Sequence, residues 1–341
     1  MTDKKNSYFA EALSLMTATI PLLLTRLAVY MGFFFIAMLW FGFWGGLGLF
    51  LGAVLNSGMG VFICFVIAVG FGWPMWRLAR KYVLYMVKAP HVAAMTEVML
   101  GRDVPKGAGQ FGYGKEIVEN YFKDASVLWL VHEAVDAAVR GLSRTITRFT
   151  RWLPDSLKKL RNIILAIIRR AAGYIDEAIF SHTIAQRHTN VYEGATEGLI
   201  LYAQNTKPIL ITAAKTYLLG KALNFVLFAM FMIPALITTA VIARAIEGAP
   251  GELLVLFGAA IALMAARFIE LAIFEPFALA YTMVTFRRET ENQQPNPEWE
   301  AKLRPLHRKV GELFDLRDEH ASEQIARQNL TAHDPSINPA N

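Results

Sequence analysis

The chain has 341 residues, of which 55% are hydrophobic and 18% charged, and its mean hydropathy is +0.35. Soluble domains average ~45–50% apolar and ~25% charged residues, so this composition excludes an ordinary soluble domain and favours a polytopic membrane protein. The formal net charge of +6 does not indicate a nucleic acid partner, because the basic residues flank apolar segments and lack interleaved aromatic side chains.

Residues 1–26 mix apolar and polar positions and contain Pro21. This pattern predicts a short N-terminal interfacial helix that leads into a first membrane span, with a loose terminus as the alternative. The apolar run that follows is far longer than the ~7–15 residues of a signal-peptide core, so we expect no cleavage.

Residues 27–76 contain no Asp, Glu, Lys, Arg or His. A spanning helix needs ~20 apolar residues, so this segment predicts a first transmembrane hairpin that reverses within 45–58. The single cysteine, Cys64, excludes a disulfide within the chain and is expected to be a packing residue. Glycines four residues apart predict close helix packing, at Gly42, Gly46, Gly48 and Gly52.

Residues 77–206 have mixed charges and no uncharged run long enough to span a bilayer. They predict a cytoplasmic region of amphipathic helices, broken by the Gly-rich segment 101–114 and by a helix stop at 152–156. The apolar stretch 163–168 is too short for a span, so its helix is expected to lie on the membrane or on its neighbours. We expect helices near 78–100, 115–150 and 155–187.

Residues 207–288 predict a second transmembrane hairpin, because 222–243 carry no formal charge and 244–252 resemble a turn. Basic residues flank the open ends of both hairpins, which predicts a multi-pass protein of the plasma (inner) membrane with both termini cytoplasmic. The polar tail, 289–341, is expected to contain one amphipathic helix over 297–327 and a disordered end.

The last apolar stretch contains the candidate intramembrane polar site and hinge, formed by Arg267, Glu270, Glu275 and Pro276. Charges at the centre of a spanning helix cost ~2.5–3.5 kcal/mol each, so they are functional candidates. Arg267 and Glu270 stand three residues apart and can pair, helical spacing places Glu275 in the same polar sector, and Pro276 permits a kink. In the alternative, Arg267 and Glu270 reach the cytoplasmic headgroups and Glu275 lies near the surface.

Neither a catalytic nor a metal site is predicted. His132, Glu133 and Asp136 lack the second histidine that a zinc-binding helix of this type requires. No nucleophile and base stand at a useful spacing, so we expect a protein that is not an enzyme and needs no cofactor. A looser set of potential ligands is expected to form a solvated face, and comprises Asp176, Glu177, His182, His188, Glu193 and Glu197.

The segment Tyr202-Ala203-Gln204-Asn205 precedes a predicted span, and Phe286-Arg287-Arg288-Glu289-Thr290-Glu291 follows the last one. With these segments, the layout of residues 174–292 resembles the C-terminal part of choline-transporter-like membrane proteins. That family has more spans and a large extracellular loop that this chain lacks, so choline transport is not implied and none of its substrate-contacting residues can be matched. Bacterial multi-pass membrane proteins of this size are the closer resemblance.

Two functional hypotheses follow. In the first, the spans form a transporter- or channel-like path for a small solute or lipid, assembled as a homo-oligomer through the glycine-rich face. In the second, the hairpins anchor a scaffold in the lipid bilayer, and its cytoplasmic helices bind a partner protein or the membrane surface. The discriminating feature is whether the polar residues of the last span face the bundle interior or the headgroups.

Overall fold

The computed structural model describes residues 2–121, 125–148, 158–187, 190–245 and 251–333, and these residues form helices and no strand. Four helical stretches are long and apolar enough to cross a membrane, as expected for an all-α membrane protein. They are Ile20–Val54, Met59–Arg77, Thr206–Ala245 and Gly251–Thr290.

The described α-helices are α1 (Thr2–Ala18), α2 (Ile20–Val54), α3 (Met59–Met99), α4 (Gly109–Tyr121), α5 (Ala125–Arg148), α6 (Lys158–Gln186), α7 (Val191–Gln204), α8 (Thr206–Ala245), α9 (Gly251–Ile269), α10 (Glu275–Thr290), α11 (Pro297–Leu303) and α12 (Arg308–His333). A π-helical turn, Glu270–Phe274, joins α9 to α10, and a 3₁₀ turn, Arg304–Leu306, follows α11.

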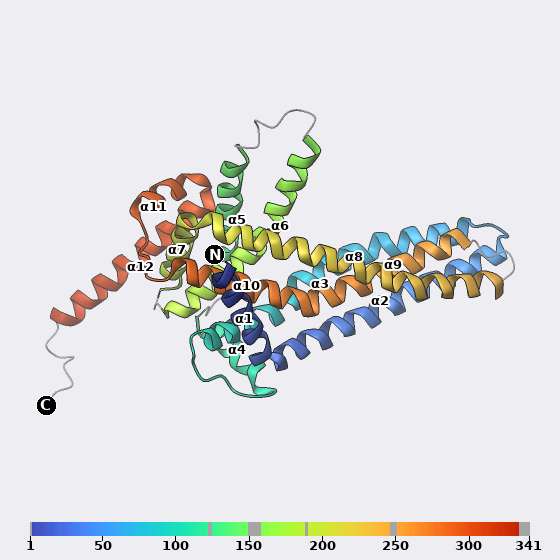
Figure 1. The fold of residues 1–341 in the computed structure, drawn as a ribbon, viewed down its shortest axis with the longest axis horizontal. Coiled ribbons are helices and arrows are strands. Elements are labelled where there is room, and N and C mark those ends of the chain that lie inside the picture. Colours follow the sequence, from blue (N-terminus) through green and yellow to red (C-terminus); the bar gives the residue numbers. More distant parts are fainter. Residues whose placement is uncertain (1, 122–124, 149–157, 188–189, 246–250, 334–341) are drawn as a thin grey trace.

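The molecule is elongated and has two parts (Figure 1). We call α2, residues 59–77 of α3, α8 and α9 the apolar bundle. The helical domain comprises α1, residues 86–99 of α3, α4 to α7 and α10 to α12. The C-terminal ends of α2 and α8 lie at the same end of the bundle, far from α1 and α12 (Figure 1).

The apolar bundle exposes its hydrophobic side chains. Leu39 is 75% exposed and Phe225 is 70% exposed. An apolar surface of this extent is typical of a protein that contacts lipid or a partner. The interior is also apolar, with Phe41, Val61 and Phe257 packed together between α2, α3 and α9.

Glycines allow α2 and α3 to approach closely near their connection. A Cβ atom at Gly48 would lie 3.0 Å from the Cα of Val61, and one at Gly60 would lie 2.8 Å from the backbone nitrogen of Gly52. Cys64, 2% exposed, packs beside Gly48 as expected. The connection itself, residues 55–58, lies inside the predicted reversal window, and Asn56 has the positive φ of 50° that asparagine tolerates.

The expected packing does not extend to Gly42 and Gly46, where a Cβ atom would meet no atom within 4 Å. These two positions make no close helix contact within the chain. A role for them between copies of the chain stays a prediction.

The expected helix boundary near residue 77 is wrong, because α3 runs unbroken from Met59 to Met99. Its basic residues do not end the helix, since Lys and Arg are good helix formers. Pro74 and Pro90 lie inside α3. The helix therefore belongs to both the apolar bundle and the helical domain.

Three glycines of the expected break, Gly109, Gly112 and Gly114, belong to α4. Gly114 is required by packing, because a Cβ atom there would lie 2.2 Å from the backbone oxygen of Pro90. The predicted loop is therefore shorter than 101–114, and the close approach of α4 to α3 explains one of its glycines.

Both terminal segments pack into the helical domain. Tyr8, Ala12 and Leu15 form one buried face of α1. The prediction of an interfacial helix within 1–26 did not include this burial. Leu313 and Phe314 are fully buried, so the middle of the predicted polar tail contributes to the core.

The helix expected over 297–327 is interrupted by the 3₁₀ turn at Arg304–Leu306, because Pro305 lacks the N–H that a continuous helix needs. Several predicted features lie outside the described residues. They are the helix stop at 152–156, His188, the turn residues 246–250 and the end of the tail at 334–341.

Candidate functional site

An ion pair with a buried arginine joins the first apolar helix to the last. Arg26, in α2, is 2% exposed, and its Nη2 donates a 2.8 Å hydrogen bond to Oε2 of Glu275. Glu275 is the first residue of α10 and directly follows the π-helical turn. A desolvated pair of this kind is stable only while both partners are present.

The π-helical turn explains a second contact of Arg26. Inside it the backbone N–H of Glu275 bonds to the carbonyl oxygen of Glu270, five residues back. The same pattern would pair Leu271 with Pro276, which has no N–H. Arg26 Nη2 lies 3.4 Å from the oxygen of Leu271 and supplies the missing donor.

Lys88 extends the pair into the helical domain. Its Nζ lies 3.7 Å from Oε1 of Glu275 and 2.8 Å from Oε1 of Glu177, in α6. We call Arg26, Lys88, Glu177 and Glu275 the junction network. Burial by itself lowers the pKa of Lys88, but the two carboxylates outweigh it and the pKa is raised. The network therefore holds two positive and two negative charges, drawn from α2, α3, α6 and α10.

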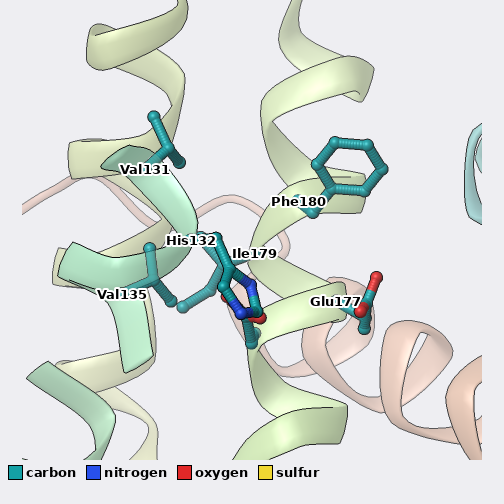
Figure 2. A pocket seen from close by; sticks show the side chains of 7 residues that line it. Val131, His132, Val135, Glu177, Ile179 and Phe180 are labelled. Carbon is teal, nitrogen blue, oxygen red and sulfur yellow. The ribbon is translucent and has the colours of Figure 1, made fainter. Parts of the chain in front are cut away.

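Beside the junction network, His132 of α5 pairs with Asp176 of α6, with 2.5 Å between Nδ1 and Oδ2. The hydrogen bond and charge of Asp176 raise the pKa of His132 to about 9. Burial raises the pKa of Asp176. In Figure 2 Val131 and His132 face Ile179 across a small recess, and Glu177 points away from His132.

The recess has a volume of about 20 Å³, which is room for roughly one water molecule. It is too small for an organic substrate. The side chains around it are Val131, His132, Val135, Asp176, Glu177, Ile179 and Phe180.

A buried histidine, His91, lies close enough to Arg26 to respond to its charge. His91 is fully buried in α3, and its Nε2 is 3.1 Å from Oγ1 of Thr19, at the junction of α1 and α2. Burial, and secondarily the charge of Arg26, lower the pKa of His91 to about 3. The imidazole is therefore neutral at physiological pH.

The predicted polar sector of the last span is divided in two. Glu270, 4% exposed, accepts hydrogen bonds from Lys221 Nζ at 3.1 and 3.3 Å and pairs with Arg267, as expected. Glu275 instead pairs with Arg26 and Lys88. The prediction of one polar sector assumed a rotation of 100° per residue. The π-helical turn between Glu270 and Glu275 is wider and rotates less per residue, so the two carboxylates point to different partners.

Another buried carboxylate, Glu97, lies near the C-terminal end of α3. It is 1% exposed and pairs with Arg102 at 2.7 Å and with Arg187 at 3.1 Å. Tyr113 donates a further hydrogen bond of 3.4 Å from α4. This cluster ties the ends of α3 and α6 together and was not predicted.

The solvated face expected for Asp176 and Glu177 is wrong, because both are 7% exposed and paired as described. Two residues of the set that the sequence analysis rejected as a zinc motif make ion pairs with other residues: Glu133 pairs with Lys309, and Asp136 with Arg140. Among the described residues no three His, Cys, Asp or Glu side chains come together as a metal site.

An apolar groove of about 170 Å³ lies between α2, α8 and α9, and its lining begins at Leu27, the residue after Arg26. Its lining contributes no exposed polar surface, so it offers shape and hydrophobic contact but no recognition of a polar ligand. The residues that line it are Leu27, Tyr30, Met31, Phe34, Phe231, Ala265, Phe268 and Ile269.

Sequence reasoning missed Arg26 and Lys88 as site residues. Both were treated as basic flanks, because Arg26 immediately precedes the uncharged run and Lys88 follows it. A usable signal exists for Arg26: it stands only six residues into the helix that starts at Ile20, where a charged side chain needs a partner.

Comparison with known proteins gives no match to a family model, a curated protein or a solved structure. The functional argument therefore uses the geometry of the junction network and the charge distribution of the chain.

Proposed function

We propose that the chain is an integral membrane protein whose α2–α3 and α8–α9 pairs insert as two hairpins, and that it anchors the helical domain in a fixed orientation at the cytoplasmic face. Helix length supports this arrangement. At 1.5 Å per residue, Arg26 lies about 42 Å along α2 from Val54, and Glu275 about 36 Å from Gly251. A hydrocarbon core is ~30 Å thick, so the junction network lies at the headgroup level or beyond it.

The charge distribution supports a cytoplasmic helical domain. Basic residues gather where the apolar bundle meets that domain, whereas the α2–α3 connection contains only Asn56 and Ser57 as polar residues. Short cytoplasmic segments of membrane proteins are enriched in Lys and Arg. The basic residues at this boundary include Arg77, Lys88, Lys207, Lys215, Lys221, Arg287 and Arg288.

The junction network is the observation that favours an anchor over a transport path. Each of its four charges has an opposite charge within 4 Å, and they belong to helices from both parts of the molecule. Beyond Arg26 the segment 27–76 has no ionisable Asp, Glu, Lys, Arg or His. Paired charges at the junction and the absence of charge over 27–76 suit a rigid joint better than an ion pathway.

Topology is tested with single cysteines in a chain where Cys64 is replaced by serine. We expect an impermeant maleimide to label Ser57→Cys in intact cells and Ser322→Cys only after lysis. Alkaline carbonate should leave the protein in the membrane fraction. Extraction by carbonate, or labelling of both positions from one side, contradicts the proposed insertion.

Anchor and transport functions are separated in proteoliposomes that contain the full chain. The anchor function predicts proton and potassium fluxes equal to those of protein-free liposomes, under both a pH gradient and a potassium potential. A flux that appears with the wild-type protein and disappears with Arg267→Leu or Glu275→Leu would establish the transport alternative instead.

A further inference from the structure

The outer parts of α5 and α6 carry a concentrated positive charge. Residues 140–148 of α5 and 158–172 of α6 contain eight Lys and Arg and no Asp or Glu. We call these two segments the basic tip. Its charged residues are Arg140, Arg144, Arg148, Lys158, Lys159, Arg161, Arg169 and Arg170.

The basic tip accounts for the positive charge of the whole protein. The chain has 34 Lys and Arg against 28 Asp and Glu, and without these eight the balance is 26 against 28. Arg140 is paired with Asp136 one turn earlier in α5, which leaves seven basic residues in the tip with no acidic residue in their own segments. A local excess of this size attracts anions over about a Debye length.

The spacing in α6 is amphipathic. At 100° per residue, the basic positions 158, 159, 161, 169 and 170 fall on one side of the helix. Leu160, Ile163, Ile164, Ile167 and Ile168 fall on the other side, and Leu165 is the one large aliphatic residue among the basic positions. A helix with basic and aliphatic sides suits the boundary between headgroups and acyl chains.

The fold places the basic tip beside the junction network. Glu177, which pairs with Lys88, lies on the same helix only five residues after residue 172, or about 8 Å along its axis. The outer parts of α5 and α6 project sideways from the long axis of the apolar bundle (Figure 1). The tip therefore extends across the bundle axis at the depth of the junction, not away from it toward α12.

We propose that the basic tip binds the headgroups of anionic phospholipids in the cytoplasmic leaflet. This inference rests on the proposed membrane anchor and names the lipid class that it contacts. Nucleic acid is the weaker partner, because neither segment of the tip contains Phe, Tyr or Trp for base stacking. Anionic headgroups need only charge and an aliphatic face, which the tip provides.

The test measures lipid enrichment around the tip by energy transfer. The full chain with Cys64→Ser and Asn162→Cys carries a donor dye and is reconstituted in nanodiscs. The acceptor is attached to the acyl chain of either phosphatidylglycerol or phosphatidylcholine at equal density. We expect stronger transfer to phosphatidylglycerol, with a ratio that falls as salt is raised. A donor at Ser322→Cys, in the exposed part of α12, should give a ratio near one.

A matched pair of variants locates the effect. Each basic residue near an anionic surface contributes about fivefold to binding, so K158Q/K159Q/R161Q should weaken lipid binding by roughly a hundredfold and bring the ratio toward one. The control K106Q/K115Q/K302Q removes the same charge from exposed positions elsewhere and should leave the ratio unchanged. Equal melting temperatures of the two variants exclude a folding defect.

Three outcomes overturn the inference: a wild-type ratio of one, a ratio unchanged by the tip substitutions, or a ratio lowered equally by the control. If the ratio is one and a duplex oligonucleotide binds the detergent-solubilised chain, nucleic acid replaces lipid as the partner. Failure of the proposed anchor is recognised separately, because carbonate would then extract the protein whatever the transfer ratio.

Discussion

Arg26 and Glu275 are 249 residues apart in the sequence and 2.8 Å apart in the structure. Their contact joins the start of the first apolar helix to the end of the π-helical turn in the last one. Because Lys88 also reaches Glu275, one carboxylate connects both apolar helix pairs to the helical domain.

Removal of Glu275 should cost more stability than removal of Arg26. In Glu275→Leu the buried guanidinium loses its carboxylate partner and keeps the oxygen of Leu271, at 3.4 Å, so we expect a loss of about 3–5 kcal/mol in the free energy of unfolding. In Arg26→Leu the carboxylate keeps Lys88, so the loss should be smaller. Denaturation of the full chain in detergent micelles measures both.

The double variant, Arg26→Leu with Glu275→Leu, should be more stable than Glu275→Leu alone, because no guanidinium is left buried without its carboxylate. The exposed pair Arg308 and Glu312 provides the control, and its replacement by leucines should change stability by no more than ~1 kcal/mol. Equal losses in Arg26→Leu and Glu275→Leu would contradict the role assigned to Lys88.

His91 should make the protein less stable in acid. Its pKa in the folded state is about 3, so between pH 6.5 and pH 3 the unfolded chain binds a proton that the folded chain does not. The contribution of neutral His91 is therefore complete above pH 6.5 and is lost as pH falls. His91→Gln, which keeps a polar partner for Thr19, should flatten the fall in melting temperature between pH 6.5 and 4. Parallel curves for the two proteins refute the assignment.

His132 should have the opposite pH dependence. With Asp176 its pKa is raised to about 9, so the pair stabilises the fold below pH 6.5 and loses that contribution as pH rises toward 9. His132 is 46% exposed, so solvent screening makes the effect modest. An NMR titration of the ring checks it: a midpoint near 9 in the wild type, moving down in Asp176→Asn. A wild-type midpoint near 6.5 would exclude the pairing.

Gly114 and Gly112 of α4 should respond to alanine with opposite signs. A Cβ atom at Gly114 would lie 2.2 Å from the oxygen of Pro90, so Gly114→Ala must displace α4 from α3 and should cost about 1–3 kcal/mol. At Gly112 no atom lies within 4 Å, and alanine should stabilise the helix by roughly 0.5–1 kcal/mol. Thermal unfolding of the two variants decides the point, and two changes of the same sign would contradict this packing.

The helices that could be predicted from the sequence are those fixed by local pattern. The absence of charge over 27–76 indicates two apolar helices joined by a turn, and its absence over 222–243 indicates a further apolar helix. The end of α6 at Gln186 lies one residue from its predicted end. The continuity of α3 through residue 77 could not be predicted. A change from apolar to basic side chains changes the surroundings that a helix prefers, but it does not interrupt the backbone hydrogen bonds.

The candidate site was less accessible to sequence reasoning. Asp176 and Glu177 pair with residues 44 and 89 positions away, and the tertiary structure alone brings these pairs together. The π-helical turn at Glu270–Phe274 changes the spacing rule used for Arg267 and Glu275. Arg267 and Glu270 were paired correctly, because Arg267 lies in the regular helix α9 and Glu270 is the first residue of the turn.

The continuity of α3 has a mechanical consequence. Its 41 residues form one unbroken helix of about 60 Å that belongs to both parts of the molecule without a linker. Hydrophobic helices adjust to a thinner or thicker bilayer by changing their tilt. With the chain inserted as proposed, such a tilt would turn the helical domain with it, so bilayer thickness would act on the orientation of that domain without any ligand.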